Sequence, residues 1–210
     1  MQIENLASPF NFTANCLLAI GAKPAMVEEA FEAAELAAVA DAILVNLGTV
    51  SERQAEAMRR AIKVANEKGV PWVLDPVGVQ ALSFRRQLAL EFMGLHPAII
   101  RGNHAEIDTL GPADCVTLAT GETDAIKHSS NSNTQTITGG VPMLRTVTAT
   151  GCAQGGICAA FLGRGQSPQD AALSASKLMK RAGELAWERA KAPGSFQVAL
   201  VDALWELSHD

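Results

Sequence analysis

Three features that define other protein classes are missing from this chain of 210 residues. It has no run of lysine and arginine, and acidic and basic residues are well mixed at a formal net charge of −5. Nucleic-acid binding needs clustered positive charge, so no such partner is indicated. No apolar stretch approaches the roughly 20 residues that cross a bilayer. The opening segment MQIENLASPF lacks the basic start and apolar core of a signal peptide. We therefore expect a cytoplasmic protein without a membrane partner.

The cysteines are few and show no metal-binding pattern. Cys16, Cys115, Cys152 and Cys158 form no CxxC pair. Three of them lie in apolar or small-residue helical contexts, so reduced thiols are expected rather than a disulfide framework. What the chain has in quantity is apolar residues, at 48%, which excludes disorder. Its length fits a single domain over residues 1–210 with a sizeable core.

Helical and strand patterns alternate along the chain. Short apolar runs predict buried strands at 42–47, 70–74, 98–100 and 116–119. Helices are predicted at 13–20, 24–39, 51–68, 84–92, 151–162, 168–190 and 197–207, with Pro24 in a first turn and Ser51 as a cap. The polar run 128–133 before 134–138 predicts a hairpin loop. The repeated βα order indicates an α/β fold, with a mostly parallel central sheet covered by helices.

Polar residues follow several of these strands. They are Asn46, Gly48 and Thr49, then Asp75, then Arg101 to Asn103 with Glu106, and then Thr120 and Gly121. Single residues of these types are ordinary turn formers. Ligands of open α/β sheets bind at the carboxyl ends of the strands, so clusters on one edge predict a small-molecule site there.

Residues 146–156, TVTATGCAQGG, read as a tight turn that enters a buried helix. Gly151 allows close approach of a ligand, and the unpaired amides of the first turn favour an anion. Cys152 lies where that field lowers the pKa of a thiol, so a proton-accepting cysteine is one interpretation. The other is a plain helix N-terminus with a small buried cysteine.

The polar residues suit phosphoryl transfer. Asp75 and Glu106 are two carboxylates able to hold Mg²⁺ through waters and phosphate oxygens. Arg101 is a fixed-charge fork suited to phosphate. Metal, cation and helix amides together supply the positioning and charge stabilisation that this reaction needs. The structural alternatives are a strand-end turn at Asp75, a surface ion pair at Arg101 and a helix first turn at Glu106.

The order of motifs resembles the hydroxyethylthiazole kinase family over nearly the whole chain. The matching segments are NFTAN at 11–15, AIGAKPAM at 19–26, VNLGT at 45–49, LDPVGV at 74–79, IRGNHAEI at 100–107, ATGE at 119–122, TATGC at 148–152 and PGSF at 193–196. The resemblance implies a ribokinase-like fold. It also implies transfer of the ATP γ-phosphoryl group to the hydroxyethyl side chain of 4-methyl-5-(2-hydroxyethyl)thiazole, a salvage step toward thiamine.

The resemblance also implies roles for individual residues. Carried over by motif, the ATP contacts are Arg101 and Thr120, the Mg²⁺–phosphate residues are Asp75 and Glu106, the thiazole contacts are Asn5, Met26 and Ala149, and the catalytic residue is Cys152. Cys152 stands where related sugar kinases carry an aspartate base. The family further implies a homotrimer with thiazole pockets between subunits, so that Met26 acts across an interface.

The chain departs from the family pattern in four places. Ala149 stands where a substrate-contacting glycine is usual, and Gln80 replaces the glycine of DPVGVGA. The helix that precedes the first motif is not found here. After Ile107, only 108–115 precede the strand at Val116, whereas a parallel crossover takes about a dozen residues. A crossover segment is therefore expected to be lacking. Three interpretations follow: an active thiazole kinase, a related ribokinase-like kinase with another small alcohol acceptor, or a non-catalytic ligand-binding variant.

Overall fold

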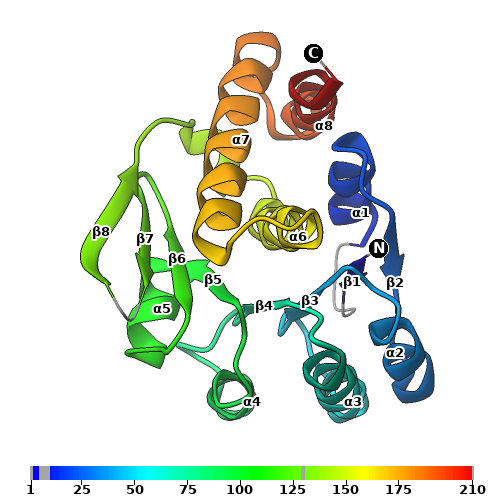
Figure 1. Ribbon diagram of the computed structural model, residues 1–210. Coiled ribbons are helices and arrows are strands. Elements are labelled where there is room, and N and C mark those ends of the chain that lie inside the picture. Colours follow the sequence, from blue (N-terminus) through cyan, green and yellow to red (C-terminus); the bar gives the residue numbers. More distant parts are fainter. Residues whose placement is uncertain (1, 5–9, 129–130, 210) are drawn as a thin grey trace.

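The computed structural model describes residues 2–4, 10–128 and 131–209, which form a three-layer α/β/α domain (Figure 1). The strands are β1 (Gln2–Glu4), β2 (Pro24–Met26), β3 (Ala42–Asn46), β4 (Trp72–Asp75), β5 (Ile99–Asn103), β6 (Val116–Thr120), β7 (Asp124–His128) and β8 (Asn131–Ile137). The helices are α1 (Phe10–Ala19), α2 (Ala30–Ala37), α3 (Glu52–Lys68), α4 (Ser83–Met93), α5 (His104–Leu110), the 3₁₀ helix η1 (Pro142–Arg145), α6 (Thr150–Gly163), α7 (Pro168–Arg189) and α8 (Pro193–His209). None of the described helices is both long and apolar enough to span a membrane.

The strands form one sheet in the order β2-β1-β3-β4-β5-β6-β7-β8. All pairings from β2 to β6 are parallel, and β7 and β8 add an antiparallel hairpin at one end. The mostly parallel sheet and the hairpin were both predicted from the sequence. The carboxyl ends of the parallel strands consequently meet at one edge.

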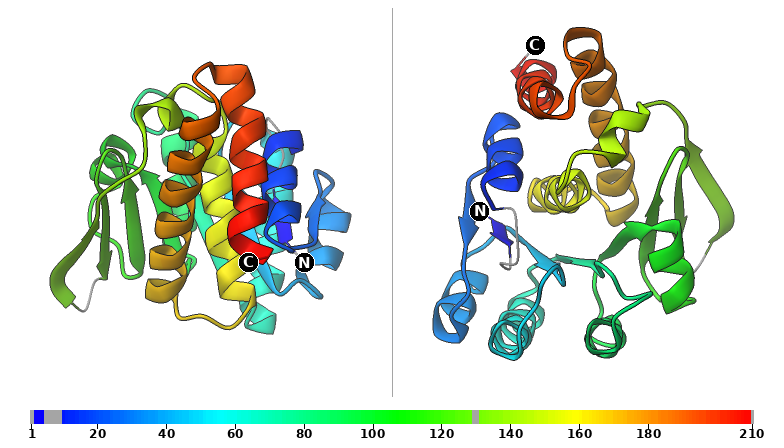
Figure 2. Two further views of the ribbon diagram at one scale, coloured as in Figure 1. Left: turned by 90° about the horizontal axis from the view of Figure 1, so that it is seen from above. Right: turned by 180° about the vertical axis from the view of Figure 1, so that it is seen from behind.

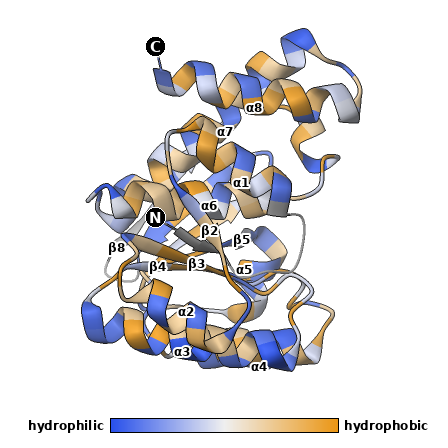
Figure 3. Ribbon diagram, turned by 90° about the vertical axis from the view of Figure 1, so that its right-hand side faces the viewer, coloured by the Kyte–Doolittle hydropathy of each residue, from blue (hydrophilic) through white to orange (hydrophobic). Residues whose placement is uncertain are grey.

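Helices cover both faces of this sheet. Helices α1, α6, α7 and α8 lie on one face, and α2, α3 and α4 on the other (Figures 1 and 2). The alternation along β3 shows why: Ala42 and Leu44 enter the first apolar core, and Ile43 and Val45 enter the second. The strands are apolar between the layers, whereas the outer surfaces of α3 and α4 are hydrophilic (Figure 3).

The start of α3 follows the local sequence closely. Ser51 accepts a hydrogen bond from the Gln54 amide, and the Gln54 side chain accepts one from the Ser51 amide. This capping box satisfies two backbone donors that a helix start leaves open. The helix ends at Gly69, whose left-handed backbone is readily adopted only by glycine. The prediction of a cap at Ser51 is confirmed.

The predicted helix from Pro24 to Val39 is wrong in its first part. Pro24–Met26 is strand β2, which pairs in parallel with β1, and α2 begins only at Ala30. Alanine and glutamate favour a helix locally, but pairing at the sheet edge decides the structure of the first residues. The short strands β1, β2 and β7 were not predicted.

The connection that follows Ile107 is short but forms a parallel crossover. Strands β5 and β6 are parallel and in register from Ile99 with Val116 to Asn103 with Thr120. Residues 104–115 connect them and include α5. The helix begins directly at the strand end, capped by Asn103, so about a dozen residues suffice. A crossover helix is present, and a shortened segment beyond it stays a prediction.

Candidate active site

A cavity of about 390 Å³ lies where β3, β4 and β5 end and α6 begins. It is lined by Gly48, Thr49, Asp75, Val77, Arg85, Arg101, Asn103, Glu106, Thr148, Ala149, Gly151 and Cys152. The structure thus brings together five predicted site residues from three distant segments: Asp75, Arg101 with Glu106, and Ala149 with Cys152. Thr120 lines an adjoining cavity, and Met26 lies in β2, separated from β3 by β1. Asn5 lies outside the described residues.

Asp75 is the most deeply buried group of the cavity, with no exposed surface. Its Oδ2 accepts a hydrogen bond of 2.9 Å from the Asn46 amide, and its Oδ1 lies 3.8 Å from Nη1 of Arg101. Burial raises the pKa of Asp75 to about 7, and the charge of Glu106 adds to that rise. Arg101, Asn46 and the Cys152 thiol act in the opposite direction. A buried carboxylate whose negative charge has so few compensating contacts is suited to a cationic ligand.

Arg101 joins β5 to the start of α6. Its Nη2 donates to Thr120 Oγ1 at 2.7 Å and to Gln154 Oε1 at 3.3 Å. A β-carbon on Gly151 would lie 2.5 Å from Nη1, so only glycine lets the guanidinium reach the helix start. Arg101 is therefore no surface ion pair, as the structural alternative supposed, since the residue is only 8% exposed. Gln154 was missed because glutamine in an apolar helix carries no specific signal.

Glu106 has a structural part in addition to its place in the cavity. One oxygen accepts from the Gly78 amide at 2.9 Å, and the other accepts from the Asn103 amide at 2.8 Å. The Asn103 side chain accepts a hydrogen bond from the Glu106 backbone amide, which completes a capping box. The structural alternative of a helix first turn is thus present together with a site position. Glu106 ties the 76–79 turn to the start of α5.

The turn before α6 has a strained entry. Ala149 has φ of +66°, in the left-handed region, directly before the first helical residue Thr150. Thr150 donates its hydroxyl to the carbonyl of Leu144 at 2.7 Å, which fixes the turn on η1. Cys152 lies in the first turn of α6 and faces Asp75. The turn therefore brings helix amides, Arg101 and a thiol to one point.

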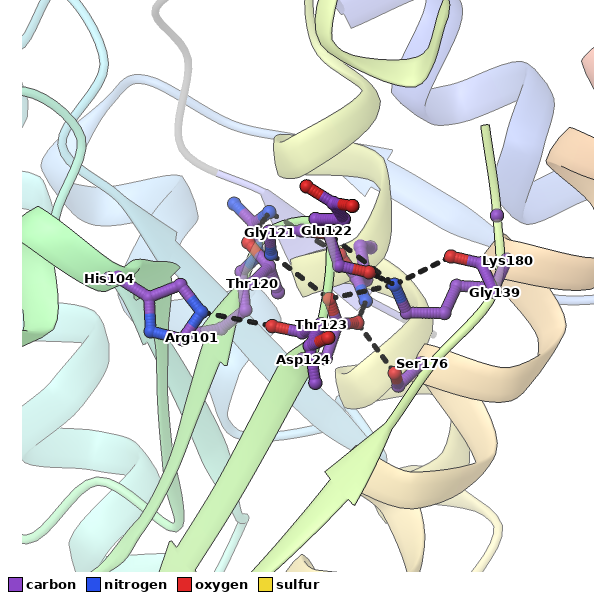
Figure 4. A network of polar contacts seen from close by, with 12 residues as sticks. Arg101, His104, Thr120, Gly121, Glu122, Thr123, Asp124, Gly139, Ser176 and Lys180 are labelled. Atoms are coloured by element: carbon purple, nitrogen blue, oxygen red, sulfur yellow. Dashed lines mark hydrogen bonds and ion pairs between the residues drawn. The ribbon is translucent and has the colours of Figure 1, made fainter. Parts of the chain in front are cut away.

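A second polar network continues from Arg101 toward α7 (Figure 4). Gln154 donates to Asp124 Oδ2 at 3.3 Å, and Ser176 donates to the same oxygen at 2.6 Å. Lys180 pairs with Asp124 Oδ1 at 3.3 Å. None of these residues was predicted. The spacing of Ser176, Lys180 and Glu184 along one helix face was the available signal.

Lys180 also holds two loops. Its ammonium donates to the carbonyls of Gly121, Glu122 and Gly139 at 3.0–3.3 Å. Glu184, one turn further along α7, accepts from the Gly140 amide at 2.9 Å, so the 139–140 peptide is bound at both ends. Cavities of about 280 and 420 Å³ lie beside these loops, and Lys180 lines both. Their combined position next to Thr120 suits the nucleoside part of a ligand.

The parallel sheet, the strand-end carboxylates and the anion-binding helix start define a small-molecule phosphotransferase of ribokinase-like fold. The hydroxyethylthiazole kinase family model matches residues 3–114 and 111–210, two segments that meet at 111–114. The chain belongs to that family. Membership makes it a phosphotransferase and implies ATP as the phosphoryl donor.

Individual relatives agree with this assignment. The chain is 41% identical to a hydroxyethylthiazole kinase of Salmonella schwarzengrund (strain CVM19633) over 93% of this chain and 83% of that protein. It is similar to the hydroxyethylthiazole kinase structure from Pyrococcus horikoshii OT3, with a TM-score of 0.92 and 33% identity over 98% of this chain and 87% of that one. A ribokinase-like superfamily protein from Enterococcus faecalis V583 has a TM-score of 0.71 at 13% identity, over 100% and 88% of the two chains, which shows the fold alone.

Proposed function

We propose that this protein transfers the γ-phosphoryl group of ATP to the hydroxyethyl group of 4-methyl-5-(2-hydroxyethyl)thiazole, in thiamine salvage. The observation that carries the proposal is the cavity in which Asp75, Arg101, Glu106 and Cys152 meet the start of α6. Phosphoryl transfer depends on positioning and on charge stabilisation around the transferred group, and these groups provide both.

The nucleotide occupies the cavities between Thr120 and Lys180 in this proposal. Arg101, Asn103 and Gly151 line both the 280 Å³ cavity and the 390 Å³ cavity, so they mark the passage between them. A triphosphate that follows this passage presents its last phosphoryl group to Asp75 and Cys152. The alcohol then approaches from the 390 Å³ cavity.

Mg²⁺ is the expected metal, and the residues fit it in a limited way. Oδ1 of Asp75 is buried and has no hydrogen-bond partner among the described residues. This is expected of a carboxylate oxygen that binds a cation. Among the described residues, no three histidine, cysteine or acidic side chains lie close enough together to hold a metal ion by themselves. Asp75 and Glu106 would hold the ion together with waters and phosphate oxygens. Bound Mg²⁺ would neutralise charge on the phosphate oxygens.

Cys152 takes the proton of the alcohol in this proposal. The thiol lies in the cavity at the start of α6, in the first turn of the helix. A thiol is a modest base, so positioning and charge stabilisation supply most of the rate. Arg101 supplies charge-assisted hydrogen bonds to the phosphates.

The acceptor is the least constrained part of the proposal. Ala149 brings a β-carbon to the cavity wall where the family has glycine, and apolar pockets discriminate near-isosteres by only a few kcal/mol. Asn5 would contact the thiazole, and Met26 would complete the thiazole pocket from a neighbouring subunit of a homotrimer.

The test is ATP consumption with the thiazole alcohol, a pyrimidine alcohol and pyridoxal as acceptors, each with Mg²⁺. We expect turnover to be fastest with the thiazole alcohol. Preference for another alcohol would favour a related ribokinase-like kinase, as Ala149 and Gln80 allow. Nucleotide binding without turnover of any acceptor would overturn the proposal in favour of a ligand-binding variant.

A further inference from the structure

The 390 Å³ cavity holds a second arginine that none of the roles above uses. Arg85 lies in the first turn of α4 and is half-buried. It lines the cavity together with Asp75, Arg101 and Cys152. The sequence motifs pass it over because it follows the 74–79 segment by several residues.

The guanidinium of Arg85 is only partly engaged. Its Nη1 donates to the Val77 carbonyl at 3.1 Å. A β-carbon on Gly78 would lie 2.8 Å from the same nitrogen, so glycine lets the group pack against the turn. A guanidinium carries five N–H donors, and among the described residues no carboxylate forms an ion pair with this one. Arg85 is thus a cation fixed to the turn by one hydrogen bond, and its other N–H groups can donate to a ligand.

The position of Arg85 relative to Arg101 indicates what it meets. Arg101 is bound to β6 and α6. It lines both the 280 Å³ cavity, here called the nucleotide cavity, and the 390 Å³ cavity, here called the acceptor cavity. Arg85 is bound to the 76–79 turn and lines only the acceptor cavity of the two. A polyphosphate that extended past Arg101 from the first cavity into the second would place its terminal group in the cavity that Arg85 lines.

We infer that Arg85 binds the phosphoryl group that is transferred, and afterwards the phosphate of the product. The inference rests on the proposed kinase function. Two guanidinium groups then hold the reacting phosphate from different elements, Arg101 from the sheet and Arg85 from α4. In the transition state, charge spreads over the equatorial oxygens, where such donors have most effect.

The next residue supplies a matched control. Arg86 donates to the carbonyls of Val79 and Gln80, in the same turn that Arg85 binds. It does not line the 390 Å³ cavity. Arg85→Ala and Arg86→Ala therefore remove similar support from the turn, but only the first removes a cation from the cavity.

The kinetic test compares the parent with Arg85→Ala, Arg85→Lys and Arg86→Ala. We expect Arg85→Ala to lower kcat by about 10- to 100-fold, the loss of one charge-assisted contact, with little change in KM for the alcohol. Free guanidinium ion should restore part of that activity, and Arg85→Lys should fall between the parent and Arg85→Ala. Arg86→Ala should retain parental kcat. Both alanine variants should have similar thermal midpoints.

A binding test decides the matter without turnover. A non-hydrolysable ATP analogue and ADP are titrated calorimetrically into each protein. Arg85→Ala should weaken the analogue by about tenfold or more while leaving ADP unchanged, because only the analogue has the terminal group. Equal losses for both nucleotides, or none, would show that Arg85 only supports the turn and would overturn the inference. If the parent phosphorylates no alcohol, the proposed function fails. The loss of affinity for the analogue relative to the loss for ADP still tests Arg85.

Discussion

Two buried aspartates, Asp75 and Asp124, lie on either side of the α6 start and differ in how they are compensated. Asp124 accepts from Ser176, from Gln154 and from the Gly121 amide, and it pairs with Lys180 at 3.3 Å. Asp75 accepts from the side chains of Asn46 and Cys152, and its nearest cation is 3.8 Å away. A buried charge is stable only when it is paired and hydrogen-bonded. The protein alone therefore compensates the charge of Asp124 more fully than that of Asp75, as the proposed metal role of Asp75 requires.

The comparison separates a structural carboxylate from a chemical one. Asp124 organises the loops around the cavities of 280 and 420 Å³ through Lys180, and its role is complete in the protein alone. Asp75 has an oxygen without a hydrogen-bond partner among the described residues and a pKa raised by burial to about 7. Strongly perturbed groups in a cleft mark functional sites more often than structural ones. Mutations on the two sides should accordingly affect different quantities.

The largest effect is expected on the structural side, from Lys180→Met. The change leaves Asp124 buried without its cation and removes the donor to three carbonyls. We expect the free energy of unfolding to fall by about 3–5 kcal/mol. Urea denaturation measures it, and Arg189→Met on the same helix is the control because its pair with Glu206 is exposed. A similar small loss for both variants would contradict the assignment of Lys180.

Asp75→Asn should instead lower the activity and leave the protein folded. We expect kcat to fall by about 10²- to 10³-fold, because the carboxylate that would hold Mg²⁺ beside the phosphate loses its charge. The fold should persist, since an amide can still accept from Asn46. Asp124→Asn is the partner variant and should lower stability while each folded molecule keeps near-parental kcat. The distinction between the two carboxylates would be refuted by equal losses of kcat.

Asp75 should also make stability depend on pH. Its folded pKa of about 7 lies above the ordinary value of 3.8, so the folded state holds the proton more tightly. The corresponding stability is present below about pH 4 and is lost as the pH rises through 7. Without nucleotide or Mg²⁺, the urea midpoint of Asp75→Asn should therefore rise relative to that of the parent as the pH increases from 4.5 to 8. A constant gap across this range would mean that Asp75 titrates as an ordinary carboxyl.

Cys152 gives a smaller and more specific test on the chemical side. Cys152→Ser should bind both substrates but turn over at least about tenfold more slowly, because a hydroxyl hardly ionises near neutral pH. Cys152→Asp should retain or exceed parental kcat, and the helix dipole should tolerate its charge. The measurement is kcat at saturating ATP, Mg²⁺ and alcohol. An active serine variant beside an inactive aspartate variant would reduce Cys152 to packing.

The smallest effect is expected at Ala149. Its φ of +66° costs a residue with a β-carbon about 1–2 kcal/mol, and glycine avoids the cost. Ala149→Gly should therefore raise the free energy of unfolding by roughly 1 kcal/mol, less what glycine gains in the unfolded chain. KM for the thiazole alcohol should fall if the β-carbon narrows the cavity. Calorimetric unfolding and steady-state kinetics check the two effects, and Thr148→Gly, outside the left-handed position, should destabilise.

Local patterns in the sequence determined the regular elements and one edge of the site. Runs such as 42–47 can only be buried strands, and the Ser51 cap marks its helix by side-chain chemistry that acts over a few residues. Parallel strands bring their carboxyl ends together, so Asp75 and Arg101 could be placed at one edge before any coordinates. Local pattern also singled out Cys152 and Glu106, and the family motifs gave them roles.

Tertiary structure alone decided which polar and charged groups have a hydrogen-bond or ion-pair partner. The strand at Pro24 exists because β1 lies beside it, and the short crossover works because α5 starts at the strand end. Lys180 and Arg85 have no motif, and their roles arise from contacts with segments far away in the chain. Burial and pairing depend on distances between such segments, which local pattern does not encode. For that reason two aspartates that look alike in the sequence became a completed ion pair and an open site.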